Sequence, residues 1–106
     1  MKKIIKKSAK KSTPARQYVV VRTYSAGVHV GYLVSRDGPE VVLADAARVW
    51  RWRGAHTLHE IALRGAAQEY TRISERVPSI TLTGAIEIIG ASDSARDNLL
   101  ATRWAR

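Results

Sequence analysis

The chain has no cysteine among its 106 residues and no long apolar run. The first absence excludes disulfide frameworks, thiolate zinc sites and cysteine nucleophiles, and it favours a reducing compartment such as the cytoplasm. The second leaves no segment of the roughly 20 apolar residues that span a bilayer, so no membrane partner is expected. The opening MKKIIKKSAKK begins like a signal peptide but lacks the apolar middle of one. The sequence therefore predicts a soluble cytoplasmic protein.

Lysine is missing from residue 12 onward, and the formal net charge of +9 is therefore unevenly distributed. Residues 1–16 carry +7 from six lysines and Arg16, whereas residues 17–106 carry +2 from eleven arginines and nine carboxylates. The six lysines are Lys2, Lys3, Lys6, Lys7, Lys10 and Lys11. This pattern predicts a disordered basic arm over 1–16 and a single small domain over 17–106. Such an arm can attract nucleic acid without sequence preference, and a simple solubility extension is the alternative.

The domain is expected to consist mainly of β-strands, because β-branched and aromatic residues are concentrated in short runs between turn residues. Five strands are expected, at 18–24, 28–35, 40–53, 70–77 and 80–89. Ser25-Ala26-Gly27 and Asp37-Gly38 supply the first two turns. The third strand is expected to be either one long strand or a strand with a bulge near Asp45, and the last strand is expected to carry a bulge at Gly84.

Two short helices are expected beside the strands. Thr57 and Glu60 form a capping box, in which the threonine hydroxyl accepts from the N3 amide and the glutamate reaches back, and Gly65 is suited to end this helix. Ser92 or Asp93 can cap a second helix near the end of the chain. With about five antiparallel strands, these helices predict an α+β domain of mainly β class, a small barrel or half-barrel. A closed barrel would leave no free strand edge.

Two resemblances add to this interpretation. The segments VRTYSAGVHVG, EVVLADAARVW, WRWRGAHTLHEIA and AIEII resemble a family of small uncharacterised proteins encoded by phages and prophages, over about five-sixths of the chain. This resemblance implies an accessory protein in the cytoplasm of a bacterial host, without an assigned activity.

The segment GYLVSRDGPEVVL resembles the first motif of Sm-like RNA-binding barrels, with Gly31, Leu33 and Asp37 in the corresponding places. The base-contacting asparagine of that family is replaced by Val41, and the following leucine comes one residue early. The resemblance therefore implies an Sm-like or, more generally, SH3-like barrel that forms homo-oligomers, while it puts the uridine pocket in doubt.

The run RVWRWR, residues 48–53, is the strongest candidate for contact with nucleic acid. In a regular strand, Trp50 and Trp52 would share one face with Arg48, and Arg51 and Arg53 would share the other. Indole and guanidinium planes stack on bases, and arginines bind phosphates, so either face is a candidate nucleic-acid surface. The alternative is that the tryptophans cover the core and the arginines are solvated.

A second candidate surface surrounds the first turn. Tyr18, Arg22 and Tyr24 would share the face opposite Val19 and Val21, and Ser25 follows in the turn. An arginine that binds a phosphate beside stacking tyrosines suits an anion or nucleotide pocket. A subunit interface, formed with Trp50 and Trp52, uses the same residue types and is the alternative.

Neither catalysis nor metal binding is expected. The sequence has no Gly-x-Ser-x-Gly elbow around Ser25 or Ser74, no phosphate-loop glycines and no paired carboxylates at catalytic spacing. His56 and His59 are three residues apart, but His56 precedes the helix and Glu60 is engaged in capping, which argues against zinc. The sequence thus predicts a protein that is not an enzyme and has no cofactor.

We therefore expect a non-catalytic phage-type accessory protein that binds nucleic acid or nucleotides through the basic arm and an arginine and aromatic surface. The alternatives are a counter-defence factor, which would bind a host protein or sequester a signalling nucleotide, and a minor virion component. The residues do not separate these functions.

Overall fold

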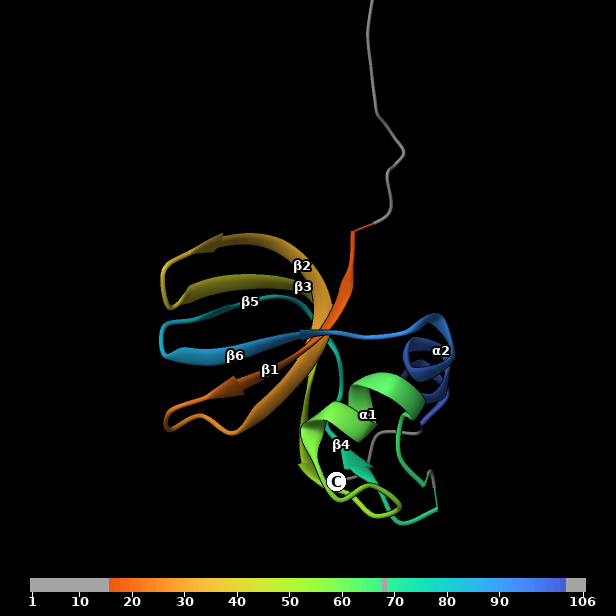
Figure 1. Cartoon of the computed structure of the whole chain (residues 1–106). Helices are drawn as coiled ribbons and strands as arrows, with labels where there is room; N and C mark the ends of the chain where they lie inside the picture. The colour runs from red at the N-terminus through yellow and green to blue at the C-terminus, as the bar shows by residue number, and fades with distance from the viewer. Residues whose placement is uncertain (1–15, 68, 103–106) are drawn as a thin grey trace, which may run out of the picture.

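The computed structural model describes residues 16–67 and 69–102, so the six lysines of the expected basic arm lie outside the described residues. Six strands and two helices follow one another along this part of the chain (Figure 1). They are β1 (Tyr18–Thr23), β2 (Val28–Asp37), β3 (Glu40–Arg51), α1 (Leu58–Arg64), β4 (Arg72–Ile73), β5 (Val77–Leu82), β6 (Ala85–Gly90) and α2 (Asp93–Ala101). Neither of the two helices is long and apolar enough to cross a bilayer.

All strand pairs are antiparallel, and they form one sheet in the order β4-β3-β2-β1-β6, with β5 also paired to β3. The mainly β class is thereby confirmed. The closed barrel of five strands is wrong, because the sheet has six strands and, within the described residues, no ladder joins β5 to β6. β5 pairs with β3, and β6 pairs with β1. The sheet curls so that β5 and β6 lie on the same side of it (Figure 1).

The last expected strand, 80–89, is in fact two strands. Gly84 is not a bulge within a strand: it lies in the connection from β5 to β6, where its carbonyl accepts from the Tyr24 N–H at 2.8 Å. The expected strand 70–77 is likewise shorter, because the long β3 uses one edge for two partners. Residues 41–46 of β3 pair with β5, and only the far end of β3 pairs with the two-residue β4.

The bulge expected near Asp45 is confirmed. The register between β2 and β3 shifts there, and Asp45 has a positive φ of 50°, which aspartate tolerates better than most residues. Gly31 lies opposite the bulge, where an added Cβ would come within 3.0 Å of the Ala44 carbonyl oxygen. The extra residue reverses the side-chain alternation of β3, so that one strand contributes to two separate cores.

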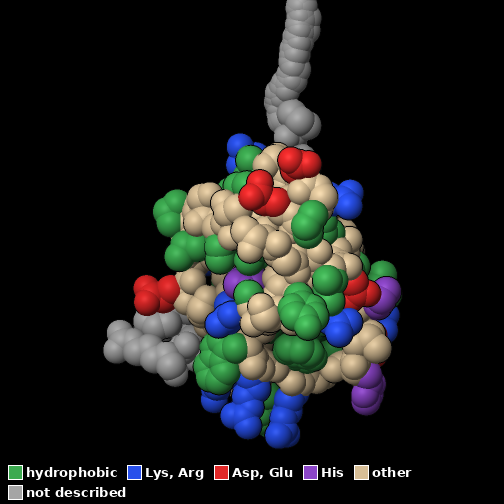
Figure 2. Space-filling view, turned by 90° about the vertical axis from the view of Figure 1, so that its left-hand side faces the viewer, with side chains coloured by type: hydrophobic (Ala, Val, Ile, Leu, Met, Phe, Trp, Pro, Cys, Tyr) green, Lys and Arg blue, Asp and Glu red, His purple; other side chains and the backbone are tan. Residues whose placement is uncertain are grey.

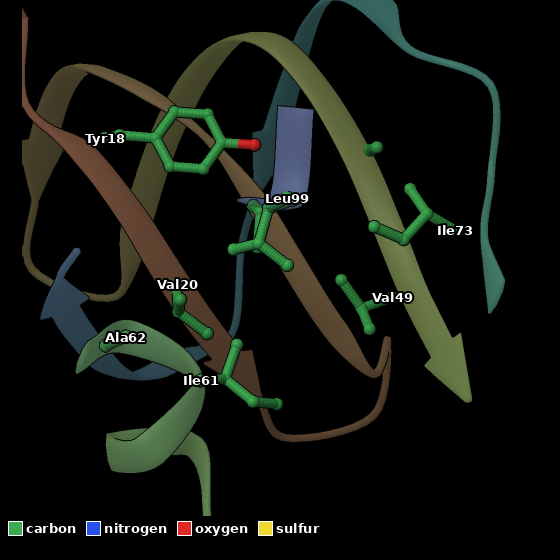
Figure 3. Close-up of a cluster of buried hydrophobic side chains, with 9 residues drawn as sticks. Tyr18, Val20, Val49, Ile61, Ala62, Ile73 and Leu99 are labelled. Carbon is green, nitrogen blue, oxygen red and sulfur yellow. The ribbon is translucent and has the colours of Figure 1, made fainter. Parts of the chain in front are cut away.

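The two cores lie on opposite faces of the sheet. One is enclosed by the curled strands and contains Val19, Val21, Val41, Leu43, Ala46 and Leu82. The other lies under the two helices and contains Tyr18, Val20, Val30, Ala47, Val49, Ile61, Ala62, Ile73 and Leu99 (Figure 3). β1 is buried on both faces because Val19 and Val21 face the first core while Tyr18 and Val20 face the second.

Both expected helices are confirmed, with their caps. The Thr57 hydroxyl accepts from the Glu60 N–H at 3.2 Å, and Gly65 ends α1 with a φ of 80°. Glu60 reaches back one residue further than expected, to the N–H of His56 at 3.1 Å. Ser92 caps α2 and also donates to the Leu63 carbonyl at 2.7 Å, which ties the second helix to the first.

Replacement of Ile61 by alanine tests whether α1 is an integral part of the second core. Because Ile61 is fully buried, we expect the free energy of unfolding to fall by about 2–5 kcal/mol. Leu63→Ala in the same helix is the matched control: Leu63 is 57% exposed, and its loss should change stability by less than about 0.5 kcal/mol. Equal effects of the two substitutions in urea unfolding would show that α1 does not pack as described.

Candidate nucleic-acid interface

The run RVWRWR does not continue the simple alternation that its sequence predicts. The pairing of β3 with β4 shifts register between Val49 and Arg51, which is the mark of a second bulge. Val49 is buried at 2% exposure and Trp50 is 48% exposed, as alternation requires, but Arg51 after the bulge is exposed as well. Trp52 then turns inward and packs against the second core. The prediction that the two tryptophans share a face is therefore wrong.

The bulge places Arg51 on the outer surface next to Trp50 and directly opposite Arg72 of β4. Side chains of opposed residues in an antiparallel pair project from the same face, so the side chains of Arg51 and Arg72 leave the sheet on one side. Arg53 follows, with its guanidinium carbon 5.7 Å from the ring centroid of Tyr70, which is 54% exposed. We call Arg51, Arg53, Arg72, Trp50 and Tyr70 the arginine–aromatic patch.

The arginines of this patch differ from most others in having no acidic partner among the described residues. Ion pairs are formed instead by Arg22 with Glu87, Arg64 with Glu60, Arg76 with Asp45, and Arg96 with Asp93 and Asp97. The blue side chains in Figure 2 are all arginines, since every lysine is outside the described residues, and several project together from the lower end of the molecule. β4 lies at that end in Figure 1. The three arginines of the patch thus belong to the part of the fold around β4, and none of them has an ion pair among the described residues.

The sequence predicted Trp50, Arg51 and Arg53 as surface residues. It did not predict Arg72 of β4 or Tyr70, which precedes β4. Both lie in a segment that was expected to be an ordinary strand. Their only sequence signal was the basic and aromatic pair in YTR. This pair indicates a surface shared with Arg51 only when the pairing of β4 with the end of β3 is known.

Arg48 lies on the same strand but serves a different purpose. Its Nε donates to the Ala26 carbonyl at 3.0 Å, and its Nη2 binds the same oxygen. The guanidinium group thereby fastens the end of β3 to the turn between β1 and β2. Arg48 is exposed, so the rest of its donors face solvent.

The residues of the second predicted surface do not lie on one surface in the structure. Tyr18 does not line the outer surface: it is buried in the second core at 4% exposure, where it packs edge-on against Tyr32 with ring centroids 5.0 Å apart. Burial raises the pKa of the Tyr18 hydroxyl, as does the nearby Tyr32. Arg22 is exposed and pairs with Glu87 at 3.5 Å.

Tyr24 and Ser25, by contrast, line a groove of about 680 Å³ at the open end of the first core. Tyr24 is 84% exposed, the largest exposure among the big apolar side chains that the structure describes. Ser25 is exposed beside it. Arg48 and His29 line the same groove, whereas Arg22 and Tyr18 do not. That the groove binds an anion or a nucleotide stays a prediction.

The comparison with protein families matches residues 16–99 to a family described as a domain of unknown function, DUF6948. The chain belongs to this family. Comparison with curated proteins and with solved structures gave no match. The matched range begins just before β1 and ends within α2, so the match covers the whole sheet, α1 and the residues of the arginine–aromatic patch and the groove in this chain. An uncharacterised family was expected, and that part of the resemblance is confirmed.

Within the described ranges, no three His, Asp or Glu side chains come together as a metal site. His56 and His59 lie at the start of α1, both exposed, and the Glu60 carboxylate is held by the backbone of His56. The absence of a metal or cofactor from the function stays a prediction.

His29 is the one buried histidine, at 4% exposure, and its Nε2 lies 3.0 Å from the Ala26 carbonyl oxygen. Burial lowers the pKa of the imidazole from its ordinary 6.5, and although the hydrogen bond to Ala26 opposes this, the Arg48 guanidinium adds to the lowering. His29 is therefore held in its neutral form in the folded protein at neutral pH, and it donates from Nε2.

We expect His29 to make stability depend on pH. The unfolded chain accepts a proton near pH 6.5 and the folded chain only at lower pH, so the free energy of unfolding should fall as the pH drops below about 6.5. Urea unfolding between about pH 7.5 and about pH 5 measures this, and His29→Gln should flatten the profile. His59→Gln, at an exposed position, should keep it. Identical profiles for the wild type and His29→Gln would contradict the assignment.

Proposed function

We propose that the protein is a non-catalytic nucleic-acid-binding module that contacts phosphates and bases through the arginine–aromatic patch. The observation that supports this most is the juxtaposition of Arg51, Arg53 and Arg72, without acidic partners among the described residues, beside the exposed rings of Trp50 and Tyr70. Unpaired cations next to exposed aromatics are the combination that single-stranded nucleic acid requires, because its backbone is anionic and its bases stack.

The opposed pair Arg51 and Arg72 strengthens the proposal. Like charges directly opposite each other in a sheet are destabilising, and here no described carboxylate relieves them. A bridging phosphate would relieve the repulsion, since each guanidinium group can donate two parallel hydrogen bonds to its oxygens. The patch is therefore more favourable with a polyanion bound than without one.

The exposed rings supply the second contribution to the free energy of binding nucleic acid. Stacking of one base on an aromatic side chain stabilises a complex by about 1–3 kcal/mol and does not depend on which base it is. Trp50 and Tyr70 are each about half exposed although both are large and partly apolar, and the fold gains little from that exposure. We propose binding without strong sequence preference.

The lysine-rich arm fits this function as a source of non-specific attraction, since six lysines in the same chain as the three arginines of the patch increase the local concentration of a polyanion. The proposed setting is an accessory protein of a phage in the bacterial cytoplasm, as the sequence resemblance implies. Homo-oligomers, which the Sm-like resemblance implies, would place several patches side by side.

Replacement of Arg72 by glutamine tests the patch. Each phosphate contact contributes about 0.7 to the slope of log affinity against log salt on single strands, and about 0.9 on duplex DNA. We expect Arg72→Gln to weaken binding of an oligonucleotide and to reduce the slope by about one such contact. Titration by fluorescence anisotropy at several salt concentrations measures both quantities.

Arg36→Gln is the matched control for this experiment. Arg36 is exposed in the β2–β3 hairpin, donates only to the Gly38 carbonyl at 3.3 Å, and carries the same charge. Its loss should leave the slope unchanged if the patch is a localised site. Equal effects of Arg72→Gln and Arg36→Gln would show that only net charge matters, and the patch would then have no special role.

Removal of residues 1–16 tests the arm separately. The sheet begins at Tyr18, so we expect the free energy of unfolding to stay unchanged. Affinity for an oligonucleotide should fall, and the salt slope should become less steep by about 0.7–0.9 for every lysine that contacts a phosphate. Unchanged affinity and slope would assign binding to the folded domain alone.

A further inference from the structure

We infer that the groove beside Tyr24 is a second binding site, which takes a single phosphorylated nucleoside. It opens where the first core ends, between the β1–β2 turn, the end of β3 and the connection from β5 to β6. Its lining is polar around an apolar floor, and we call it the Tyr24 groove. Its lining includes Tyr24, Ser25, Arg48 and Thr81, with Ile80 and Leu82 as the apolar floor.

The backbone that carries Tyr24 is firmly held. The Thr23 hydroxyl accepts from the Ala26 N–H at 2.8 Å and donates to the Gly27 carbonyl at 2.7 Å. The Tyr24 N–H donates to the Gly84 carbonyl at 2.8 Å, which fixes the turn to the opposite wall of the groove. The backbone beneath the 84% exposed Tyr24 ring is thus ordered before a ligand arrives, which lowers the entropy cost of ordering the turn on binding.

The opposite end of the turn is fixed by an unusual convergence of donors. The Ala26 carbonyl oxygen receives the Arg48 Nε at 3.0 Å, a second contact from Arg48 Nη2, and the His29 Nε2 at 3.0 Å. A guanidinium group has five N–H donors, so three of those of Arg48 are left for a ligand. Its position is set by the turn it braces, which holds the remaining donors at the groove.

The charge of the Tyr24 groove selects an anion. Arg48 is the only lining residue that is charged at neutral pH, because no carboxylate lines the groove and His29 is kept neutral by burial. The exposed hydroxyls of Ser25, Thr81 and Thr83 can donate to phosphate oxygens that Arg48 attracts.

The shape and floor of the groove select a flat, partly apolar group attached to that anion. Ile80 and Leu82 form the apolar part, and the ring of Tyr24 stands at the rim. A volume of about 680 Å³ lies within the range of sites for small ligands, roughly 300–1,000 Å³. A nucleobase against Tyr24 with its phosphate at Arg48 satisfies all of these features together.

Such a nucleotide can come from two sources, a free mononucleotide or the phosphorylated end of a strand. The geometry accommodates the second source because Arg48 and Trp50 project from the same face of β3, about 6.7 Å apart along the strand. A strand on the arginine–aromatic patch could therefore continue into the Tyr24 groove. The groove is nevertheless built from residues of its own, so the inference does not depend on the patch.

The test is calorimetric titration of the full chain with adenosine 5′-monophosphate, with adenosine, and with a short oligo(dA) that does or does not carry a 5′-phosphate. We expect the phosphorylated ligand of at least one pair to bind more tightly than its unphosphorylated counterpart. Tyr24→Ala should weaken that binding about tenfold, the loss of one stacked base, and Tyr24→Phe should retain it. Because Tyr24 is so exposed, neither substitution threatens the fold.

Tyr70→Ala is the matched control, since it removes an exposed tyrosine of the patch. It should weaken oligonucleotide binding and leave adenosine 5′-monophosphate binding unchanged. Binding of the free mononucleotide identifies a small-molecule site, whereas binding of the phosphorylated oligonucleotide alone identifies a site for strand ends. If Tyr24→Ala binds every ligand as the wild type does, the inference is overturned, whatever Arg72→Gln shows for the patch.

Discussion

The fold depends most on the bulge at which the alternation of side chains along β3 is interrupted. A regular strand of 12 residues would present one set of side chains to each face along its whole length. The bulge at Asp45 moves the inward set by one residue, so Val41 and Leu43 fill the core inside the curled sheet while Ala47 and Val49 fill the core under the helices. Two small cores, each insufficient alone, are thus stabilised by one continuous strand.

The second interruption of β3 creates surface instead of core. After Val49 the register shifts again, and Arg51 joins Trp50 outside instead of following Val49 inward. The short β4 then brings Arg72 against it. Bulges at the ends of strands commonly re-aim side chains near functional sites. Here the result is that three arginines without a described ion pair lie where two large rings are exposed.

In the turn between β1 and β2, by contrast, a cationic side chain holds the backbone instead of remaining unpaired on the surface. Arg48 and His29 both bind the carbonyl of Ala26, and the neutral state of His29 leaves Arg48 as the single cation of the Tyr24 groove. The same sheet thus carries the two surfaces for which we propose anionic ligands. One is open and contains several arginines, which suits the proposed polymer, and the other is a braced groove, which suits the proposed single nucleotide.

The sequence by itself determined the local features: the first three strands, the turn at Gly38, the bulge at Asp45, the Thr57 cap and the separation of lysine from arginine. Each depends on residues that are neighbours in the chain. Tertiary structure decided that 80–89 splits between two sheet edges, that Tyr18 is buried, and that Arg72 meets Arg51. These outcomes follow from pairing between distant strands, and a shift of one residue in such pairing exchanges the inner and outer faces without any local signal.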